Sequence, residues 1–214
     1  MEKISVFEIF KIGIGPSSSH AMGPWNAAKD FLSIIKNNLG SLKGAICIEV
    51  ELFGSLAKTG KGHGTDKAIM MGLMGFTIST FKSVQLVKNL EIIKSEQKIS
   101  LLNDIKIPFN PTEHIKFNFT EINLDHANTI NFKLSFSDGR IESATYFSVG
   151  GGFIQRKGTE SKSSDKSWIP YPIQTAEHML RWCKSENKTL AQISMENELC
   201  WQSEIDIKCK LDKI

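Results

Sequence analysis

The sequence predicts an α+β fold, with a mixed, largely antiparallel sheet packed against helices and a short helical segment after it. Residues 45–53 alternate apolar and polar side chains as a strand does, and residues 130–136 and 141–147 do the same. An Asp-Gly pair at 138–139 joins the last two strands into a hairpin. Over residues 24–39, apolar side chains recur every three or four positions, which predicts an amphipathic helix.

The predicted helices are bounded by residues that commonly start and stop helices. Pro24 suits the first turn of the first helix, and Gly40 is placed to end it. A second, apolar helix is predicted over residues 67–76, and either Thr65 or Asp66 would cap it.

The rest of the chain divides into an ambiguous stretch, a further strand and a helical end. Residues 77–110 mix charged and apolar side chains without a clean period, so no element is predicted there. Residues 114–119 alternate and predict a strand. Residues 175–184 and 189–201 predict two helices.

The length of 214 residues suffices for one generous domain or two small ones. From residue 155 to residue 167 the composition shifts to Lys, Ser, Gly, Thr and Asp, beside two prolines, which indicates a linker. We therefore expect a first domain over residues 1–155, a linker over 156–172 and the start of a helical domain over 173–214.

The composition excludes several classes of protein. Hydrophobic residues make up 41% of the chain and charged residues 23%, which excludes a disordered chain. The 26 Lys and Arg exceed the 23 Asp and Glu by only three charges, and no basic run occurs, so no nucleic-acid partner is predicted. No segment approaches the roughly 20 apolar residues of a membrane helix, and no signal peptide is evident. We expect a cytoplasmic protein that does not bind membranes.

The cysteines predict neither a metal site nor a disulfide framework. They lie at Cys47, Cys183, Cys200 and Cys209, and no Cys-x-x-Cys pair occurs. Zinc and iron–sulfur motifs need closer spacing, and four cysteines are too few to staple a chain of this length. No metal ligand is therefore predicted in this chain.

Two glycine-rich loops carry the residues best suited to chemistry. In the first, residues 13–20, three adjacent serines and a histidine precede a predicted helix. These are Ser17, Ser18, Ser19 and His20. Hydroxyls and free N–H groups at a helix N-terminus attract a carboxylate or a phosphate. The alternative is that the serines only cap the helix.

The second loop, residues 60–66, places His63 between two glycines and lacks the Walker pattern of a phosphate loop. Glycines let a substrate approach the backbone closely, so His63 suits a general base or acid near neutral pH. A plain exposed loop histidine is the alternative. The histidines at 114, 126 and 178 carry no comparable signal, and no two histidines have the spacing of a metal-binding helix.

Four strings, in this order, resemble one known family. They are ISVFEIFKIGIGPSSSH at 4–20, LFGSLAKTGKGHGTDKA at 52–68, YFSVGGGFI at 146–154 and PYPI at 170–173. From residue 4 to about residue 205 the chain resembles the bacterial iron–sulfur-dependent L-serine dehydratases, also called L-serine deaminases. One departure follows the histidine of the first string, where Ala21 stands in place of the family's usual threonine.

The resemblance implies a lyase that converts L-serine to pyruvate and ammonia with a [4Fe–4S] cluster, one iron of which acts as a Lewis acid on the serine hydroxyl. It implies that the first domain is the β part of the enzyme and is similar to the allosteric substrate-binding domain of some phosphoglycerate dehydrogenases. The cluster cysteines would lie in an α part, and the four cysteines of this chain match none of them. The complete enzyme would be a cytoplasmic homo-oligomer in amino-acid metabolism and gluconeogenesis.

The resemblance also implies roles for the residues of both loops. The substrate carboxylate would be held by three hydroxyls, those of Ser17, Ser18 and Ser19. His63 would be the leading candidate for the base that removes the α-proton, and His20 would be the second. Thr65 and Asp66 would support the loop, with Asp66 orienting a histidine or the substrate ammonium.

Residues 174–183 and 190–199 resemble the first helices of the α part, and the chain ends before the family's cluster cysteines. We therefore expect a fragment, a frameshift product or a split subunit that holds half of an active site and needs an α partner. Two alternatives stay open. One is a non-catalytic module that binds serine or a small carboxylate, and the other is a lyase acting on L-threonine or L-cysteine.

Overall fold

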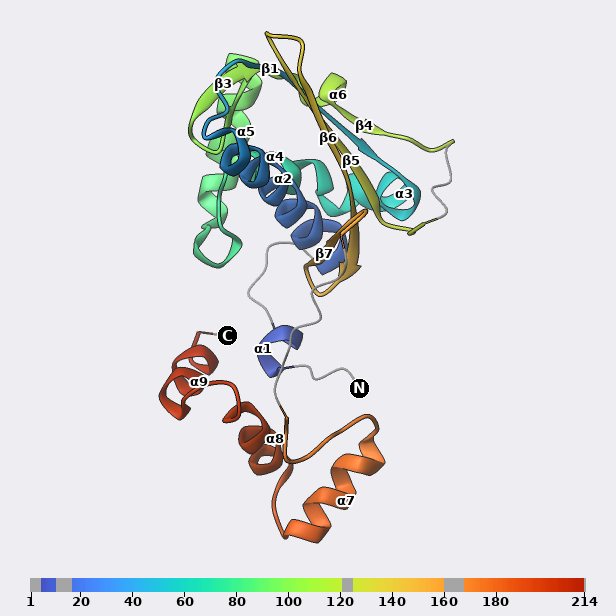
Figure 1. Ribbon diagram of the computed structural model, residues 1–214, viewed down its shortest axis with the longest axis vertical. Coiled ribbons are helices and arrows are strands. Elements are labelled where there is room, and N and C mark those ends of the chain that lie inside the picture. The colour runs from blue at the N-terminus through green and yellow to red at the C-terminus, as the bar shows by residue number, and fades with distance from the viewer. Residues whose placement is uncertain (1–4, 11–16, 121–124, 160–167, 214) are drawn as a thin grey trace. The chain divides into compact units, whose positions relative to one another are not determined.

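The computed structural model describes residues 5–10, 17–120, 125–159 and 168–213. The chain divides into two compact units (Figure 1). The larger unit spans Gly13–Glu160, and the smaller one combines Met1–Ile12 with Ser161–Ile214. Residues 13–16 of the first predicted loop and residues 160–167 of the predicted linker lie outside the described residues.

The sheet of the larger unit has the strand order β4-β1-β5-β6-β7. Its strands are β1 (Ala45–Leu52), β4 (Ile115–Phe117), β5 (Thr129–Phe136), β6 (Ile141–Gly150) and β7 (Phe153–Arg156). The pair β1 and β4 is parallel, and the other neighbouring strands are antiparallel. This mixed, largely antiparallel sheet with packed helices confirms the predicted fold class.

Helices and a small hairpin complete the larger unit. In chain order they are η1 (Ser18–Met22), α2 (Gly23–Leu39), α3 (Gly54–His63), α4 (Thr65–Leu73), η2 (Ile78–Thr80), α5 (Ser83–Glu96), the hairpin β2 (Lys98–Leu101) and β3 (Ile105–Pro108), and α6 (Pro111–His114). The stretch for which the sequence predicted no element thus contains η2, α5 and the hairpin. Helix α2 ends at Gly40, as predicted, with that residue in the left-handed conformation.

Helix α2 lies across one face of the sheet, and α4 packs beside it (Figure 1). The ring of Phe31 on α2 stacks on Phe132 of β5, with the ring centroids 5.2 Å apart. The hydroxyl of Tyr146 on β6 donates to Asp30 on α2 over 2.8 Å. Burial, together with this hydrogen bond, raises the pKa of Tyr146 well above its usual value. The ring stacking and the hydrogen bond together hold α2 across β5 and β6.

Strand β1 begins with an irregularity that simple alternation does not foresee. Alternation places Ile46 on the same face as Ile48, but the register with β5 shifts between Ala45 and Cys47. As a result Ala45 is buried and Ile46 is 51% exposed. A bulge of this kind re-aims one side chain without disturbing the rest of the strand.

The second glycine-rich stretch is helical, so its prediction as a loop was wrong. Helix α3 ends at His63, and α4 begins two residues later. Gly64 joins them with a φ of 71°, a conformation that favours glycine. Gly64 also holds the N-cap position of α4 and no side chain caps that helix, so the capping role predicted for Thr65 or Asp66 was wrong as well. Glycine lowers helix propensity by about 1 kcal/mol per residue, but the buried apolar face of α3 outweighs that cost.

The smaller unit is helical among its described residues. It contains α1 (Val6–Ile9), α7 (Ala176–Glu186), α8 (Leu190–Glu198) and α9 (Glu204–Leu211), and α7 and α8 confirm the two helices predicted near the C-terminus. The carboxylate of Glu198 accepts hydrogen bonds from the Ser5 hydroxyl over 2.9 Å and from the Val6 amide over 2.7 Å. The N-terminal turn therefore packs with the C-terminal helices, an association that the sequence did not indicate.

A buried asparagine organises the core of the smaller unit. The side chain of Asn197 accepts from the backbone N–H of Tyr171 over 3.0 Å and donates to its carbonyl over 2.8 Å. Ile193 and Ile207 are fully buried nearby in the chain's helical end. Ile169 and Tyr171 fall within the predicted linker but are also buried.

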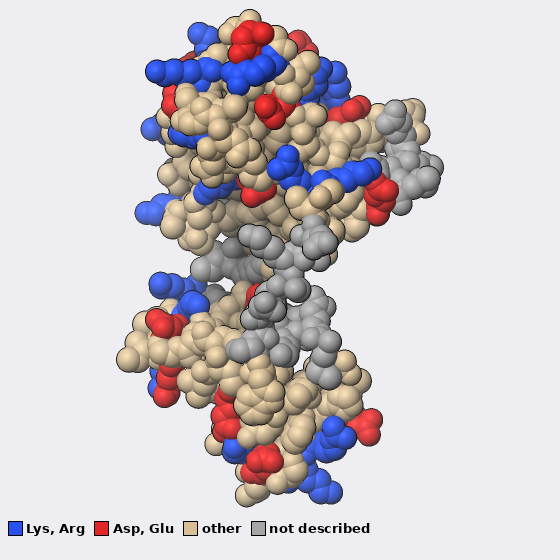
Figure 2. All heavy atoms as spheres, viewed as in Figure 1, with Lys and Arg blue, Asp and Glu red and all other residues tan. Residues whose placement is uncertain are grey.

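Within the described part of the chain, no helix combines the length and the apolar character needed to cross a membrane. On the face drawn in Figure 2, basic and acidic side chains are interspersed. That distribution agrees with the small net charge of the sequence.

Candidate active site

The residues singled out in the two glycine-rich stretches meet where η1 leads into α2. The turn η1 is a π-helix, in which the N–H of Gly23 bonds to the carbonyl of Ser18. Such turns are rare and often occur at functional sites. Here the turn brings His20 against α3.

Hydroxyl groups surround both ring nitrogens of His20. Its Nδ1 lies 3.2 Å from the hydroxyl of Ser17 and 3.0 Å from that of Ser19. Its Nε2 lies 3.1 Å from the hydroxyl of Ser55 and 3.0 Å from that of Thr59, both on α3. The ring is therefore held in place from both sides.

His63, at the last turn of α3, stacks against His20. The ring centroids are 4.8 Å apart and the ring planes are tilted by 40°. The Nδ1 of His63 lies 2.8 Å from the carbonyl oxygen of Thr59. Its Nε2 makes no hydrogen bond to any residue that the structure describes. One nitrogen of His63 is thus left for a ligand.

The surroundings of His20 favour its neutral form. Burial lowers the pKa of His20, and the neighbouring imidazole of His63 lowers it further, while a hydrogen bond with the backbone of Ser55 opposes both effects. Two adjacent imidazoles disfavour simultaneous protonation because their charges would repel. At neutral pH His20 is therefore an uncharged partner of the hydroxyls around it.

Two buried hydroxyls tie the backbone of η1 to the rest of the larger unit. Thr65 on α4 donates to the carbonyl of His20 over 2.6 Å, and Ser148 on β6 donates to the carbonyl of Ser19 over 2.7 Å. Both residues are completely buried. Gly23 is required beside them, because a Cβ at that position would lie 1.9 Å from the Ser148 hydroxyl oxygen. The turn that carries His20 is therefore anchored to two elements.

A third segment, residues 126–128, joins the site and was not predicted to do so. The amide of Ser55 donates to the carbonyl of Ala127 over 2.8 Å. The side-chain amide of Asn128 donates to the carbonyl of Ser148 over 3.2 Å. The backbone N–H of Asn128 donates to Nδ1 of His126 over 3.0 Å. No local pattern marks this segment, because its contacts join parts of the chain far apart in sequence.

Two buried acceptors of this region have no donor among the described residues. They are one carboxylate oxygen of Asp66 and the side-chain oxygen of Asn128. A buried acceptor without a partner costs about 1 to 3 kcal/mol, so such atoms are rare in folded proteins. Neither residue lines the cavity that adjoins His63.

The predicted site residues do not all behave alike. Ser17 and Ser19 turn their hydroxyls to His20, whereas Ser18 is exposed and makes no side-chain hydrogen bond within the described chain. Thr65 supports His20 through the backbone. The two sequence segments, which lie more than 40 residues apart in the chain, are therefore brought together by Ser17, Ser19, His20, His63 and Thr65.

A cavity of about 240 Å³ adjoins His63. Its lining consists of Ala21, Trp25, Gly62, His63, Gly64, Lys67, Ala68 and Leu86. Pockets for drug-sized ligands usually measure about 300 to 1,000 Å³. A cavity of this size suits a smaller molecule, such as an amino acid.

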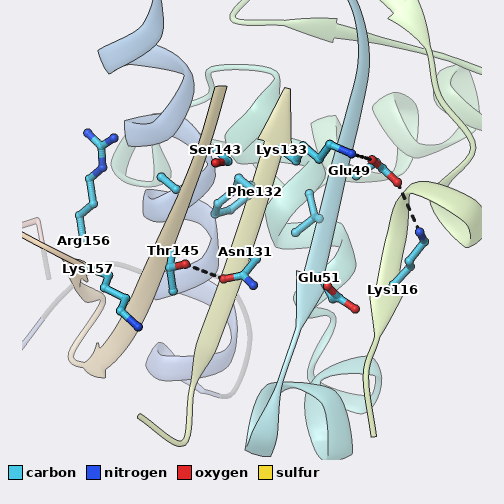
Figure 3. Close-up of a pocket in the computed structure, with 12 residues that line it drawn as sticks. Glu49, Glu51, Lys116, Asn131, Phe132, Lys133, Ser143, Thr145, Arg156 and Lys157 are labelled. Carbon is cyan, nitrogen blue, oxygen red and sulfur yellow. Dashed lines mark hydrogen bonds and ion pairs between the residues drawn. The ribbon is translucent and has the colours of Figure 1, made fainter. Parts of the chain in front are cut away.

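A second hollow, of about 590 Å³, lies on the sheet face opposite α2 (Figure 3). One of its carboxylates pairs with two lysines: Glu49 contacts Lys133 over 3.1 Å and Lys116 over 3.3 Å. These two lysines hold the pKa of Glu49 below its usual value. Thr145 likewise donates to Asn131 over 2.8 Å. None of the predicted site residues reaches this hollow, and its satisfied polar groups are typical of a solvated sheet face.

The described residues do not fit a metal centre. Among them, no group of three His, Cys, Asp or Glu side chains lies close enough to hold a metal ion. The four cysteines are unpaired and distributed over β1 and the C-terminal part of the chain. The [4Fe–4S] cluster that the sequence resemblance implies therefore finds no ligand set in the described part of this chain.

The fold and the site together define an α+β domain that gathers hydroxyls around a pair of histidines, one of which, His63, lines a small cavity. The chain belongs to the serine dehydratase beta chain family, whose model matches residues 5–159.

Relatives with curated names agree with this assignment. The chain is 36% identical over 209 residues to the L-serine dehydratase of Streptomyces coelicolor, covering 96% of this chain and 46% of that protein. It is 35% identical over 214 residues to L-serine dehydratase 2 of Escherichia coli, covering 99% of this chain and 46% of the relative. The L-serine dehydratase of Haemophilus influenzae is 33% identical over 216 residues, covering 99% and 47%. The chain thus spans just under half the length of these relatives.

Proposed function

We propose that this chain is the β part of an L-serine dehydratase, which converts L-serine to pyruvate and ammonia. In this role it binds the substrate and supplies the base that removes the α-proton. The observation that carries the proposal is the contact between the rings of His20 and His63. In this arrangement Nδ1 of His63 is hydrogen-bonded, and its Nε2 has no partner within the described residues. The family membership of the chain supports the choice of substrate.

The proposed carboxylate site is the entry to η1 and α2. Ser17, Ser18 and Ser19 would offer hydroxyls to the substrate carboxylate, and the positive end of the helix dipole would favour its charge. Because Ser17 and Ser19 contact His20 in this structure, they would have to rotate toward the carboxylate when it binds. Ser18 is exposed and is free of that constraint.

The proposed base is His63, with His20 beside it as the second candidate. The Nδ1 of His63 is held by the Thr59 carbonyl, so a lone pair on Nε2 would accept the α-proton of serine. The β-hydroxyl then takes up a proton and leaves as water, which gives aminoacrylate. The imine tautomer of aminoacrylate adds one water and releases ammonia, which leaves pyruvate. Both nitrogens of His20 are engaged by hydroxyls, which favours a supporting role for that ring.

The proposed ammonium site includes Asp66. One of its carboxylate oxygens is buried and lacks a donor among the described residues. The substrate ammonium carries three N–H donors and a positive charge. It would satisfy that oxygen after Asp66 rotates toward the cavity beside His63, which Asp66 does not line in this structure. Thr65, the residue before Asp66, would hold the segments of His20 and His63 together through its hydrogen bond to the His20 carbonyl.

The complete enzyme would require an α part, present as a further domain or as a separate subunit. Since the described residues hold no metal-ligand set, the [4Fe–4S] cluster would have to be bound by that α part. Exposed apolar side chains of the smaller unit, such as Leu180 (62% exposed) and Ile205 (75% exposed), would pack against it. Assembly of the complete enzyme as a homo-oligomer is part of the same proposal.

The test combines this chain with the α part of an L-serine dehydratase and reconstitutes iron and sulfide without oxygen. Pyruvate formed from L-serine is then measured. We expect His63→Gln to lower the rate by about 10²- to 10⁴-fold, because the general base is lost. His178→Gln, in the smaller unit, serves as the matched control and should leave the rate unchanged. An equal rate for wild type and His63→Gln contradicts the proposed base.

Binding can be tested on the chain alone. L-serine should raise the temperature of thermal unfolding in a concentration-dependent manner, since a ligand that binds only the folded state stabilises it. D-serine is the control. Stabilisation by L-serine without any pyruvate formation in the reconstituted mixture would favour the non-catalytic binding module. Absence of stabilisation would contradict a substrate site on this chain.

A further inference from the structure

Thr59 contacts both histidines of the candidate site with different atoms. It lies on α3, one turn before His63. Its side-chain hydroxyl lies 3.0 Å from Nε2 of His20, and its backbone carbonyl lies 2.8 Å from Nδ1 of His63. A single residue therefore faces one nitrogen of each ring.

The hydroxyl of Thr59 decides which nitrogen of His20 carries the proton. A threonine hydroxyl has one proton, and here it donates to the carbonyl of Ser55 over 3.0 Å. In its contact with His20 the same hydroxyl can then only accept, which favours the tautomer of His20 with the proton on Nε2. The Nδ1 of His20 is left with a lone pair, which accepts from the hydroxyl of Ser17 or Ser19.

The carbonyl of Thr59 decides the opposite arrangement for His63. A carbonyl oxygen only accepts, so Nδ1 of His63 must carry the proton in their 2.8 Å contact. In the neutral ring the lone pair then lies on Nε2, the nitrogen that has no partner among the described residues. The contacts of Thr59 thus favour opposite tautomers in the two neighbouring rings, each through a different atom of Thr59.

We propose that Thr59 is a positioning residue that holds His20 and His63 in opposite tautomers, so that only His63 presents a lone pair to a ligand. The use of this arrangement in catalysis rests on the proposed function. If His63 is the base, the opposite tautomers explain why His63 and not His20 accepts the proton. The tautomers themselves do not depend on that function and can be observed in the chain alone.

The test is a long-range ¹H–¹⁵N correlation spectrum of the whole chain with ¹⁵N-labelled histidine. It is recorded at about pH 8, above the ordinary histidine pKa of about 6.5. The ¹⁵N shift separates a ring nitrogen that carries a proton from one that carries a lone pair. In the wild type we expect His20 protonated at Nε2 and His63 protonated at Nδ1. The finding of His63 protonated at Nε2, or of both rings in one tautomer, overturns the proposal without any variant.

Variants separate the side chain of Thr59 from its backbone. Thr59→Val keeps the shape and the carbonyl but removes the hydroxyl. We expect the ring shifts of His20 to move toward a mixture of tautomers, since the hydroxyl of Ser55 can then donate to Nε2. The ring shifts of His63 should stay unchanged. Thr59→Ser keeps a hydroxyl and should retain the wild-type spectrum of both rings.

The outcomes also distinguish this proposal from the proposed function. An unchanged His20 spectrum in a folded Thr59→Val variant overturns the role of Thr59, whatever the activity of the enzyme. Conversely, the expected tautomers together with full activity of His63→Gln would leave the positioning role intact and remove His63 as the base. Each result therefore bears on only one of the two claims.

Discussion

The hydroxyl of Ser148 donates a 2.7 Å hydrogen bond to the carbonyl of Ser19, a residue 129 positions earlier in the chain. This bond attaches the turn that carries His20 to β6, the strand next to the edge strand β7. Ser148 is completely buried, so water does not compete for the bond. The position of the candidate site thus depends on a contact between the two ends of the larger unit's sequence.

We predict that Gly23→Ala destabilises the larger unit by about 1 to 3 kcal/mol, the usual cost of overpacking a buried site. The added Cβ would lie 1.9 Å from the Ser148 hydroxyl oxygen and 2.8 Å from its Cβ. Urea unfolding measures the change. Gly62→Ala is the matched control, because a Cβ there meets nothing within 4 Å, and it should not destabilise the chain.

The same clash predicts a specific coupling. Ser148→Gly removes both clashing atoms, so the double variant Gly23→Ala/Ser148→Gly should be less destabilised than the sum of the two single variants. Strict additivity of the two substitutions would show that the close approach of Gly23 to Ser148 does not limit the packing.

We predict that the larger unit loses stability as the pH falls below the ordinary histidine pKa. Burial and the neighbouring His63 lower the pKa of His20 in the folded state. Just below pH 6.5 the unfolded chain therefore binds more protons at this position than the folded chain, so stability rises with pH there. The stability that depends on an uncharged His20 is fully present above about pH 6.5 and is lost as the pH falls through the lowered pKa of His20.

Urea midpoints measured between about pH 5 and pH 8 test this linkage. His20→Gln should flatten the dependence in this range, whereas His178→Gln, in the other unit, should not. Equal slopes for wild type and His20→Gln would mean that His20 does not contribute to the loss of stability in acid.

We predict that Tyr146→Phe lowers the free energy of unfolding of the larger unit by about 1 to 2 kcal/mol, because a hydrogen bond to a carboxylate is lost. The hydroxyl of Tyr146 is the donor to Asp30 that ties α2 to β6. Hydrogen exchange of the buried amides of β5 and β6 measures the effect. Tyr171→Phe, which removes a hydroxyl bonded to Glu196 in the smaller unit, should leave those amides unaffected.

We predict that Glu198→Gln releases the N-terminal turn from the C-terminal helices. The carboxylate accepts from both the Ser5 hydroxyl and the Val6 amide, and a glutamine side chain has only one acceptor oxygen. Faster exchange of the Val6 amide is the expected result. Glu186→Gln, at the exposed end of α7, is the control. If Val6 exchanges equally fast in wild type and Glu198→Gln, the carboxylate does not hold that turn.

Local patterns were sufficient to predict many of the elements. The period of α2, its stop at Gly40 and the Asp-Gly hairpin each depend on residues within a few positions of one another, and all three agree with the structure. The same reasoning failed for α3. Its glycines weaken the local preference for a helix, whereas the burial that stabilises it comes from contacts with distant residues.

The sequence by itself determined the family, the α+β class and the two segments that carry serines and histidines. Only the tertiary structure decided that these segments meet, with His20 against His63 and with residues 126–128 beside them. It also decided which hydroxyls and carbonyls face each ring nitrogen, and the proposed tautomers follow from those contacts. Hydrogen bonds are short and directional, and those between these segments exist only once the chain has folded.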